Sequence, residues 1–312
     1  MKKPNNWLKL GRVCASYSEL DSAMTHSSVP IAEHIEGDLF RIYFSTRDAK
    51  NRSFTTSLVI NINSPNVIVE QPSTIVLSPG GLGEFDDSGA MGSWITQYEG
   101  KKYFYYIGWN VGSTVPFRNS IGLSIASTTE GFQRYSPGPI VDRTPFEPHF
   151  CASCCVLKDG NKWRMWYLSC TEWFMQFNGK PEHRYHIKYA ESKDGINWDR
   201  HGLVAIDYLD QNEIAISRPS VIFDAGIWKM WFSYRSVDLS YRIGYAQSYD
   251  GISWDRAEGA VLDVSDDGWD SEMVAYPYVF EHKGQRYMLY NGNDYGRTGF
   301  GLAKEIHHDP FQ

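Results

Sequence analysis

The feature that most constrains the fold of this chain is a segment that recurs along it. Residues 119–141, 184–206 and 240–262 each contain an alternating strand, an Asp-Gly or Glu-Gly turn, an aromatic residue, a basic residue and a glycine before a β-branched run. A fourth copy begins at Thr298–Ala303 and lacks its second half. That half stands at the N-terminus, where Trp7-Leu-Lys-Leu-Gly11 repeats the spacing of Trp198-Asp-Arg-His-Gly202. A chain whose first strand completes its last repeat is expected to close into a ring.

A second pattern lies upstream of each copy: a strand, a short turn and an aromatic-rich strand, as in Pro219–Phe223 and Ile227–Phe232. The markers of the first strand stand 65, 60, 66 and 58 residues apart; they are Ser28, Ser93, Ser153, Pro219 and Pro277. Four strands per unit at this period is typical of a propeller blade. The sequence therefore predicts an all-β fold, a five-bladed β-propeller that forms a single domain over residues 1–312 and is closed by an N-terminal strand.

Composition excludes several classes of partner. The net charge is −7, and acidic and basic residues are interspersed, so no basic stripe is present to bind a nucleic acid. No apolar run approaches the length of a membrane span, and the N-terminal residues lack the apolar stretch of a signal peptide. The cysteines number five, an odd count. Together with the missing signal peptide, this favours a reducing compartment and a cytoplasmic location.

Three of the cysteines crowd together at Cys151, Cys154 and Cys155. A zinc site there would need further ligands such as His149 and Cys170. The favoured alternative is a core strand, in which cysteine behaves as a small hydrophobic residue. We therefore expect neither a metal nor another cofactor.

The expected blade topology places the loop entering each first strand and the loop leaving each second strand on one face. The entering loops each hold a carboxylate, namely Asp21, Asp87, Glu147, Glu213 and Glu272. The leaving loops add arginines, asparagines and tryptophans, and this mixture of polar groups and aromatic rings suits a sugar. The Asp-Gly turns at Asp194 and Asp250 are expected on the opposite face, as structural turns.

Asp87, Glu147 and Glu213 are the first candidates for catalytic carboxylates. Asp87 adjoins Asp86, and neighbouring like charges raise the pKa of one carboxyl group, as an acid catalyst requires. The alternative for every such carboxylate is that it caps a turn or pairs with a neighbouring blade. The candidates for substrate binding are His26, Arg47, Trp109, Glu172, Trp173, Arg218, Arg235, Glu272, Tyr276 and Asn291.

The five units, the strand starts Ser217-Arg218-Pro219 and Tyr276-Pro277, and the S-x-D-G-x-x-W hairpins support a family resemblance. On these features the chain resembles the five-bladed β-propeller glycosidases of glycoside hydrolase families 43, 32 and 130. The resemblance implies a carbohydrate or glycoconjugate substrate and two carboxyl groups across the scissile bond. In family 43 acids stand at the start of the first strand. The matching positions here hold Ser28, Gly92, Ala152, Ser217 and Tyr276.

Two functions therefore stay open. The first is a carbohydrate-active enzyme, a glycoside hydrolase or phosphorylase with paired carboxylates at the mouth of the propeller channel. The second is a non-catalytic propeller that binds glycans or serves as a scaffold. The crowded carboxylates and loop tryptophans favour the enzyme, and the missing acids at the strand starts favour the binding protein.

Overall fold

The computed structural model describes residues 6–15, 24–72, 74–127 and 131–306. These residues are almost entirely β-strand, and their one helix is the four-residue α1 (Asn293–Gly296). The expected all-β class is therefore confirmed. No helix among the described residues is long and apolar enough to cross a membrane.

The strands form successive antiparallel groups in chain order. The first group contains β2 (Met24–Glu36), β3 (Leu39–Asp48), β4 (Ser53–Asn61), β5 (Ile68–Glu70) and β6 (Ile75–Leu77). The second contains β7 (Gly89–Tyr98), β8 (Lys101–Val111), β9 (Phe117–Ala126) and β10 (Gln133–Arg134). The third contains β11 (Cys151–Asp159), β12 (Lys162–Met175), β13 (Pro181–Ser192), β14 (Trp198–Asp199) and β15 (Val204–Ile206).

The fourth group contains β16 (Glu213–Asp224), β17 (Ile227–Ser236), β18 (Arg242–Ser248) and β19 (Asp255–Arg256). The last contains β20 (Ala275–His282), β21 (Gln285–Asn291), β22 (Phe300–Ile306) and β1 (Asn6–Cys14). Single parallel bridges join Ser53 to Gly89 and Tyr185 to Ala215. Because of these bridges, the strands make up one four-stranded and two nine-stranded sheets rather than a separate sheet for each group.

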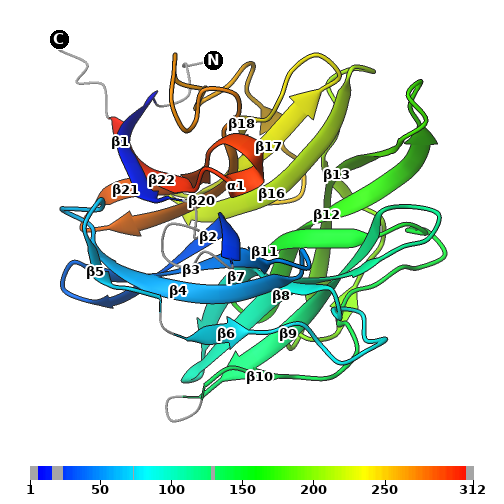
Figure 1. The fold of residues 1–312 in the computed structure, drawn as a ribbon, viewed down its shortest axis with the longest axis horizontal. Coiled ribbons are helices and arrows are strands. Elements are labelled where there is room, and N and C mark those ends of the chain that lie inside the picture. Colours follow the sequence, from blue (N-terminus) through cyan, green and yellow to red (C-terminus); the bar gives the residue numbers. More distant parts are fainter. Residues whose placement is uncertain (1–5, 16–23, 73, 128–130, 307–312) are drawn as a thin grey trace.

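The N-terminal strand completes the last group, as the repeat predicts. β1 pairs antiparallel with β22, with Lys9 opposite Ala303 and Arg12 opposite Gly301. Figure 1 shows the blue β1 beside the red β22, and the colours pass around the molecule from blue through cyan, green and yellow back to red. The first strands of the groups contact one another in the order β2, β7, β11, β16, β20 and back to β2. These first strands therefore surround the middle of the molecule.

The aromatic second strands supply the core between the groups. Trp163, Trp166 and Tyr105 are almost completely buried, as are Cys154 and Cys155 in β11. Burying a large apolar side chain contributes about 1.5–3 kcal/mol, so these aromatic side chains are a main source of stability. The core interpretation of the two cysteines is confirmed. Among the described residues, no group of three or more His, Cys, Asp or Glu side chains could hold a metal ion.

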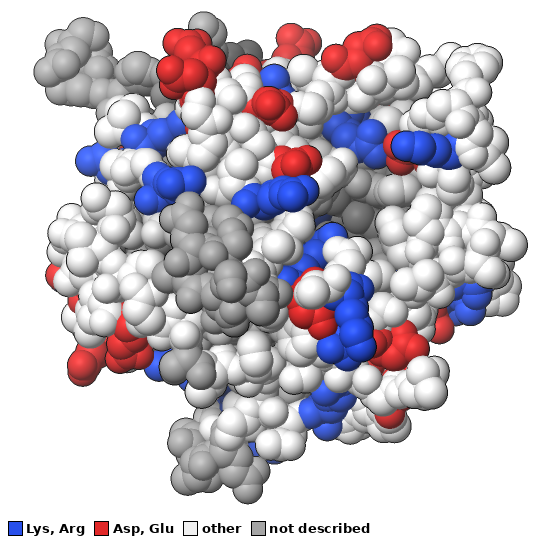
Figure 2. All heavy atoms as spheres, viewed as in Figure 1, with Lys and Arg blue, Asp and Glu red and all other residues white. Residues whose placement is uncertain are grey.

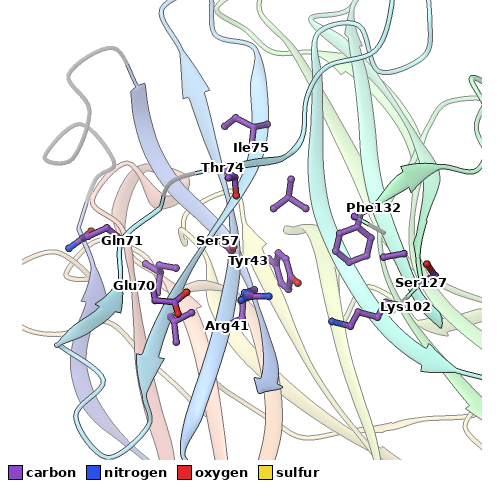
Figure 3. Close-up of a pocket in the computed structure, with 15 residues that line it drawn as sticks. Arg41, Tyr43, Ser57, Glu70, Gln71, Thr74, Ile75, Lys102, Ser127 and Phe132 are labelled. Carbon is purple, nitrogen blue, oxygen red and sulfur yellow. The ribbon is translucent and has the colours of Figure 1, made fainter. Parts of the chain in front are cut away.

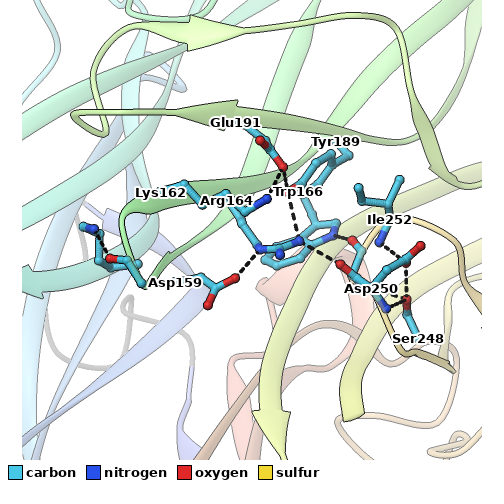
Figure 4. A network of polar contacts seen from close by, with 12 residues as sticks. Asp159, Lys162, Arg164, Trp166, Tyr189, Glu191, Ser248, Asp250 and Ile252 are labelled. Atoms are coloured by element: carbon cyan, nitrogen blue, oxygen red, sulfur yellow. Dashed lines mark hydrogen bonds and ion pairs between the residues drawn. The ribbon is translucent and has the colours of Figure 1, made fainter. Parts of the chain in front are cut away.

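Each Asp-Gly turn joins two strands of one group and accepts a hydrogen bond from the preceding group. Asp250 accepts hydrogen bonds from the backbone N–H groups of Ile252 and Ser253, and Gly251 takes a positive φ of 76°. Trp166 donates from Nε1 to the Gly251 carbonyl oxygen at 2.8 Å, within the network drawn in Figure 4. Asp194 forms the same turn, at the opposite end of β13 from Pro181. Both motifs are structural turns, as predicted.

Candidate functional site

A depression of about 490 Å³ opens where the first strands meet. We call it the central depression. Every first strand contributes to its lining, with Ser28 from β2, Met91 from β7, Ala152 from β11, Ser217 from β16 and Tyr276 from β20. Figure 2 shows a hollow near the middle of one face of the molecule, with Lys and Arg atoms beside it. Small-molecule sites are commonly concave and of this size.

β-Bulges turn side chains into the central depression. The pairing register shifts next to Val29, Arg218 and Tyr276, and these residues have positive φ values of 48°, 52° and 58°. Non-glycine residues rarely adopt this conformation, and it is a clear outlier for a β-branched valine. Bulges and strained backbone concentrate at functional sites, where they aim a side chain. All three residues line the central depression.

Neighbouring groups hold these bulges in place through side-chain acceptors. Asn291 Oδ1 accepts the Val29 N–H at 2.8 Å, and Ser153 Oγ accepts the Arg218 N–H at 3.1 Å. Ser233 Oγ accepts the Tyr276 N–H at 2.6 Å. Each N–H that the bulge removes from the strand ladder is therefore satisfied, which stabilises the strained conformation.

Aromatic rings form one wall of the central depression. Trp173 lies 5.5 Å from Phe117 and 4.7 Å from His183 between ring centroids. Tyr185 and Tyr241 share a hydrogen bond between their hydroxyl groups. A wall of this kind can cover the C–H face of a sugar, while hydroxyl and guanidinium groups bind its hydroxyls.

Positive charge dominates the lining of the central depression. Arg47, Arg218 and Arg235 line it, and Glu182 is the only carboxylate in the part of its wall that the structure describes. Glu182 Oε1 pairs with Arg235 at 3.0 Å, and its Oε2 accepts a hydrogen bond from Gln176 at 3.2 Å. Both carboxylate oxygens thus have a donor within the protein.

Arg218 forms part of the floor. Its side chain is 1% exposed and donates to the carbonyl oxygens of Gly92 and Pro30, each at 3.3 Å. Burial lowers the pKa of Arg218 to about 10, so the guanidinium is still charged at neutral pH. No carboxylate among the described residues lies within ion-pair distance of it. The two carbonyl dipoles and the Ser93 hydroxyl, which accepts a hydrogen bond at 3.4 Å, stabilise its charge.

Two histidines near the arginines are neutral at pH 7. Burial, with the nearby Arg47 and Arg297, lowers the pKa of His26 to about 4. Burial likewise holds the pKa of His183 well below its usual value, although the nearby Glu182 opposes this shift. A neutral imidazole can donate one hydrogen bond and accept another, so both side chains are suited to sugar hydroxyls.

Half of the predicted binding residues come together here. Arg47, Trp173, Arg218, Arg235 and Tyr276 line the central depression, and His26 lies close to Arg47. Glu182 and His183 were not predicted, because the functional stretch expected after the third group's second strand ended at Trp173. β12 and β13 extend as a long hairpin past those loops, to Met175 and Pro181. The blade topology could have indicated them, because the start of a third strand lies on the same face as the end of the second strand.

The structure places Glu147 and Glu213 differently from the catalytic role expected of them. They are 3% and 4% exposed and do not line the central depression. Glu147 Oε2 pairs with Arg200 at 3.1 Å, and Glu213 Oε2 pairs with Arg256 at 2.7 Å. Because buried carboxylates need such partners, the pairing alternative describes both residues.

The same arrangement recurs in two further groups. Asp86 pairs with Arg134 at 2.8 Å, and Asp270 pairs with Lys9 at 2.8 Å. Each cation is the basic residue of the repeated segment, and each carboxylate stands in the loop before a first strand. In the last group a tyrosine of the second strand also bonds to the carboxylate: the Tyr290 hydroxyl donates to Asp270 at 3.1 Å. The repeat therefore encodes a buried ion pair that fastens this loop to the outermost strand.

The remaining candidates lie outside the central depression. Asp87 accepts hydrogen bonds from Ser88 and the Gly83 N–H, and Trp109 donates to Ser53. Glu172 and Glu272 are exposed, and Asn291 is the buried acceptor for Val29. Asp21 lies outside the described residues.

A second cavity, of about 560 Å³, lies between the first and second groups. Figure 3 shows Tyr43 and Phe132 within it and Arg41 and Lys102 near one end. No residue of a first strand lines it among the described residues. Lys102 is already paired with Glu33 at 2.6 Å. The cavity is a gap between strand groups, and the central depression, with its bulged strands, is the stronger candidate site.

The chain is similar to two Mycobacterium tuberculosis proteins over nearly its whole length. They are "Uncharacterized protein MT1551" of strain CDC 1551 / Oshkosh and "Uncharacterized protein Rv1502" of strain ATCC 25618 / H37Rv. Each is 43% identical over 300 residues, which cover 95% of this chain and 98% of the relative. No protein-family model matches the chain.

Solved structures of glycoside hydrolases share the fold. One described as "Glycoside hydrolase" has a TM-score of 0.75 at 18% identity and covers 97% of this chain and 92% of its own. A thermostable family-43 glycoside hydrolase has a TM-score of 0.70 at 16% identity, with 91% of both chains covered. A family 32 β-fructofuranosidase of Bombyx mori has a TM-score of 0.61 at 12% identity, with 91% of this chain and 61% of its own covered.

These likenesses concern the fold. The expected resemblance to families 43 and 32 is confirmed at that level, and the resemblance to family 130 stays a prediction. The chain has the β-propeller fold of these glycosidases, and at 43% identity it belongs to the same family as the Mycobacterium tuberculosis proteins MT1551 and Rv1502.

Proposed function

We propose that this protein is a five-bladed β-propeller that binds a carbohydrate in the central depression. The observation that carries the proposal is the set of strained bulges at Val29, Arg218 and Tyr276, which direct side chains into a depression lined by aromatic rings and polar groups. The mutual contacts of the first strands and the pairing of β1 with β22 support a closed ring of five blades. We also propose a cytoplasmic location, because Cys151, Cys154, Cys155 and Cys170 are buried thiols that form no disulfide bond.

Glycoside hydrolysis is the second candidate function, favoured by the fold and by Glu182. Hydrolysis of a glycosidic bond generally uses two carboxyl groups about 5–9.5 Å apart. Among the described residues, Glu182 alone supplies a carboxylate to the central depression, and Arg235 holds it in an ion pair. Carbohydrate binding is therefore the better supported function. Asp87, Glu147 and Glu213 remain proposals as catalytic residues.

The binding proposal is tested with a glycan array followed by calorimetric titration. Trp173→Ala removes a ring from the aromatic wall and is expected to weaken binding about tenfold or more, a cost of about 1.4 kcal/mol or more. Tyr249→Ala is the matched control, since this 79% exposed ring stands beside Asp250, in the turn beyond the end of β18. Equal losses in both variants, or no glycan bound by the wild type, would refute the proposal.

The hydrolase candidate is tested with aryl glycosides and short oligosaccharides, without added cofactor. If the wild type turns them over, Glu182→Gln should lower the rate by about 10²–10⁴-fold. Glu147→Gln, Glu213→Gln and Asp87→Asn are measured beside it. If one of those three variants folds but loses most of its rate while Glu182→Gln stays fully active, the substituted carboxylate is catalytic and Glu182 is not.

A further inference from the structure

We propose that the carbohydrate bound in the central depression carries an anionic group, a carboxylate or a phosphate, which Arg47 contacts directly. This inference rests on the proposed function and specifies its ligand. It follows from the charges of the described lining, from the hydrogen bonds of each arginine and from the position of Arg47.

The charge of the central depression is opposite to that of the whole chain. Its described lining holds Arg47, Arg218 and Arg235 against Glu182, whereas the chain as a whole has a net charge of −7. The nearby histidines are neutral at pH 7 and do not alter this balance. A concave site with low-dielectric walls concentrates its field, so this local excess of positive charge favours an anionic ligand.

Arg218 and Arg235 are held by the protein itself. Arg218 bonds to backbone carbonyls at the floor, and Arg235 bonds to Glu182 and lies over the ring of Tyr241 at 5.6 Å. Arg218 supplies a fixed, buried charge beneath the ligand. Arg235 keeps its guanidinium oriented at the wall, where Tyr276 and Tyr241 also lie.

Arg47 is the arginine that has donors to spare. Its guanidinium donates to the side-chain oxygen of Asn51, at 3.2 Å, and no carboxylate among the described residues pairs with it. It stands at the end of β3, partly buried, and its surroundings lower its pKa through burial. A guanidinium binds a carboxylate or phosphate through two parallel hydrogen bonds, a geometry that a neutral hydroxyl cannot match.

The confinement of this charge distinguishes the site from one for a nucleic acid. The arginines line a depression of about 490 Å³, which fits a small ligand, and they do not form a stripe along a surface. The aromatic wall beside them, with Trp173 and Tyr241, can cover a sugar ring. The ligand class that satisfies both features is an acidic or phosphorylated sugar.

The test is calorimetric titration of the full chain with matched pairs of ligands. One pair is a trigalacturonate and its methyl ester, and the other is glucose 6-phosphate and glucose. We expect the anionic member of at least one pair to bind about tenfold or more tighter than its neutral partner, and to lose affinity as salt is added. The two pairs distinguish a carboxylate from a phosphate, and either preference supports the proposal.

Three variants locate the effect. Arg47→Gln should abolish the preference for the anion, so that the anionic and neutral partners bind this variant with affinities within about twofold of each other. Arg47→Lys keeps the charge without the planar fork and should retain part of the preference. Arg52→Gln is the matched control, because Arg52 is an exposed arginine in the turn after β3 that is paired with Asp48 at 2.8 Å.

The outcomes separate this inference from the proposed function. Equal binding of anionic and neutral partners overturns the inference and leaves carbohydrate binding intact. A preference for the anion that survives in folded Arg47→Gln also overturns it. Failure to bind any sugar of these pairs overturns the inference. If no member of the glycan array binds either, the proposed function is overturned as well.

Discussion

The buried carboxylates of the repeated loops lie apart from the three arginines of the central depression. The buried carboxylates fasten loops by pairing with cations of the repeated segment, and three arginines line the central depression. The carboxylates that recur along the chain thus have partners within the protein, and we propose that binding belongs to the residues of the central depression.

A substitution of Glu213 tests this assignment. Glu213→Gln leaves the buried Arg256 without its carboxylate, and removing one partner of a buried pair costs about 3–5 kcal/mol. We expect a loss of that size in the free energy of unfolding, measured with urea. Glu172→Gln is the control, because Glu172 is half exposed in its pair with Arg184 and should change stability by about 0–1 kcal/mol. An unchanged urea midpoint in Glu213→Gln would contradict the structural role.

The histidines near the arginines give the protein a defined pH dependence. The pKa of His26 is about 4 in the folded protein against a usual 6.5, so the unfolded chain binds more protons between these values. Stability is therefore lost as the pH falls from about 6.5 towards 4. His183, whose pKa is also lowered, adds in the same direction.

We expect the urea midpoint to decrease from pH 7 to pH 5, and to decrease less in a His26→Gln, His183→Gln double variant. His201→Gln, which replaces an exposed imidazole, should follow the wild type. A double variant whose midpoint falls as steeply as that of the wild type would show that these two groups do not set the slope.

Single residues also show what the sequence could predict. A carboxylate before each first strand was visible, but its partner was not, because Arg256 stands 43 residues after Glu213 and Arg200 stands 53 after Glu147. Likewise, nothing local marks the positive φ of Val29, since it arises from pairing with β3 and from Asn291 of the last group.

At the scale of elements, most of the strands and turns follow from the sequence. Gly37, Gly160 and Gly284 lie in the short turns expected after the first strands, and each has a positive φ. The extension of β12 and β13 as far as Met175 and Pro181 was not expected. The end of β12 reads Thr171-Glu-Trp-Phe-Met175 and the start of β13 reads Pro181-Glu-His-Arg184, and neither run alternates apolar with polar residues. That extension brings Glu182 and His183 to the central depression.

Removal of the first strand is the prediction at this scale. Deleting residues 1–13 leaves β22 as an unpaired edge and removes Trp7, which is 8% exposed and packs edge-to-face on Trp231. It also leaves Asp270 buried without Lys9. We expect a loss of several kcal/mol, since one buried side chain of this kind is worth about 1.5–3 kcal/mol.

Thermal unfolding followed by circular dichroism measures the effect of this deletion. Arg12→Ala is the control, because this exposed side chain makes one long hydrogen bond, to the Thr298 carbonyl oxygen at 3.5 Å. A truncated protein that melts with the wild type would contradict a stabilising role for β1.

At the scale of the whole molecule, the proposed ring explains why the strained bulges persist. Each bulge is held by a side chain of another group, as Ser153 holds Arg218 and Ser233 holds Tyr276. The central depression therefore depends on all groups being in place at once. In such a ring the position of the chain ends is immaterial, provided that β1 stays paired with β22.

A circular permutant tests that consequence. Asn6 and Ile306 are direct partners in the β1–β22 ladder, so a short Gly-Ser linker can join them. New ends are placed between Ser64 and Pro65, in the turn that follows β4, because exposed turns tolerate new termini. We expect this permutant to unfold within a few degrees of the wild type and to bind the same glycans. A permutant opened between Val156 and Leu157, inside the buried β11, should not fold.

The control for the new ends is the unpermuted chain with the same Gly-Ser linker inserted after Ser64. If that chain folds and the permutant opened at Ser64 does not, the ring is not closed through β1.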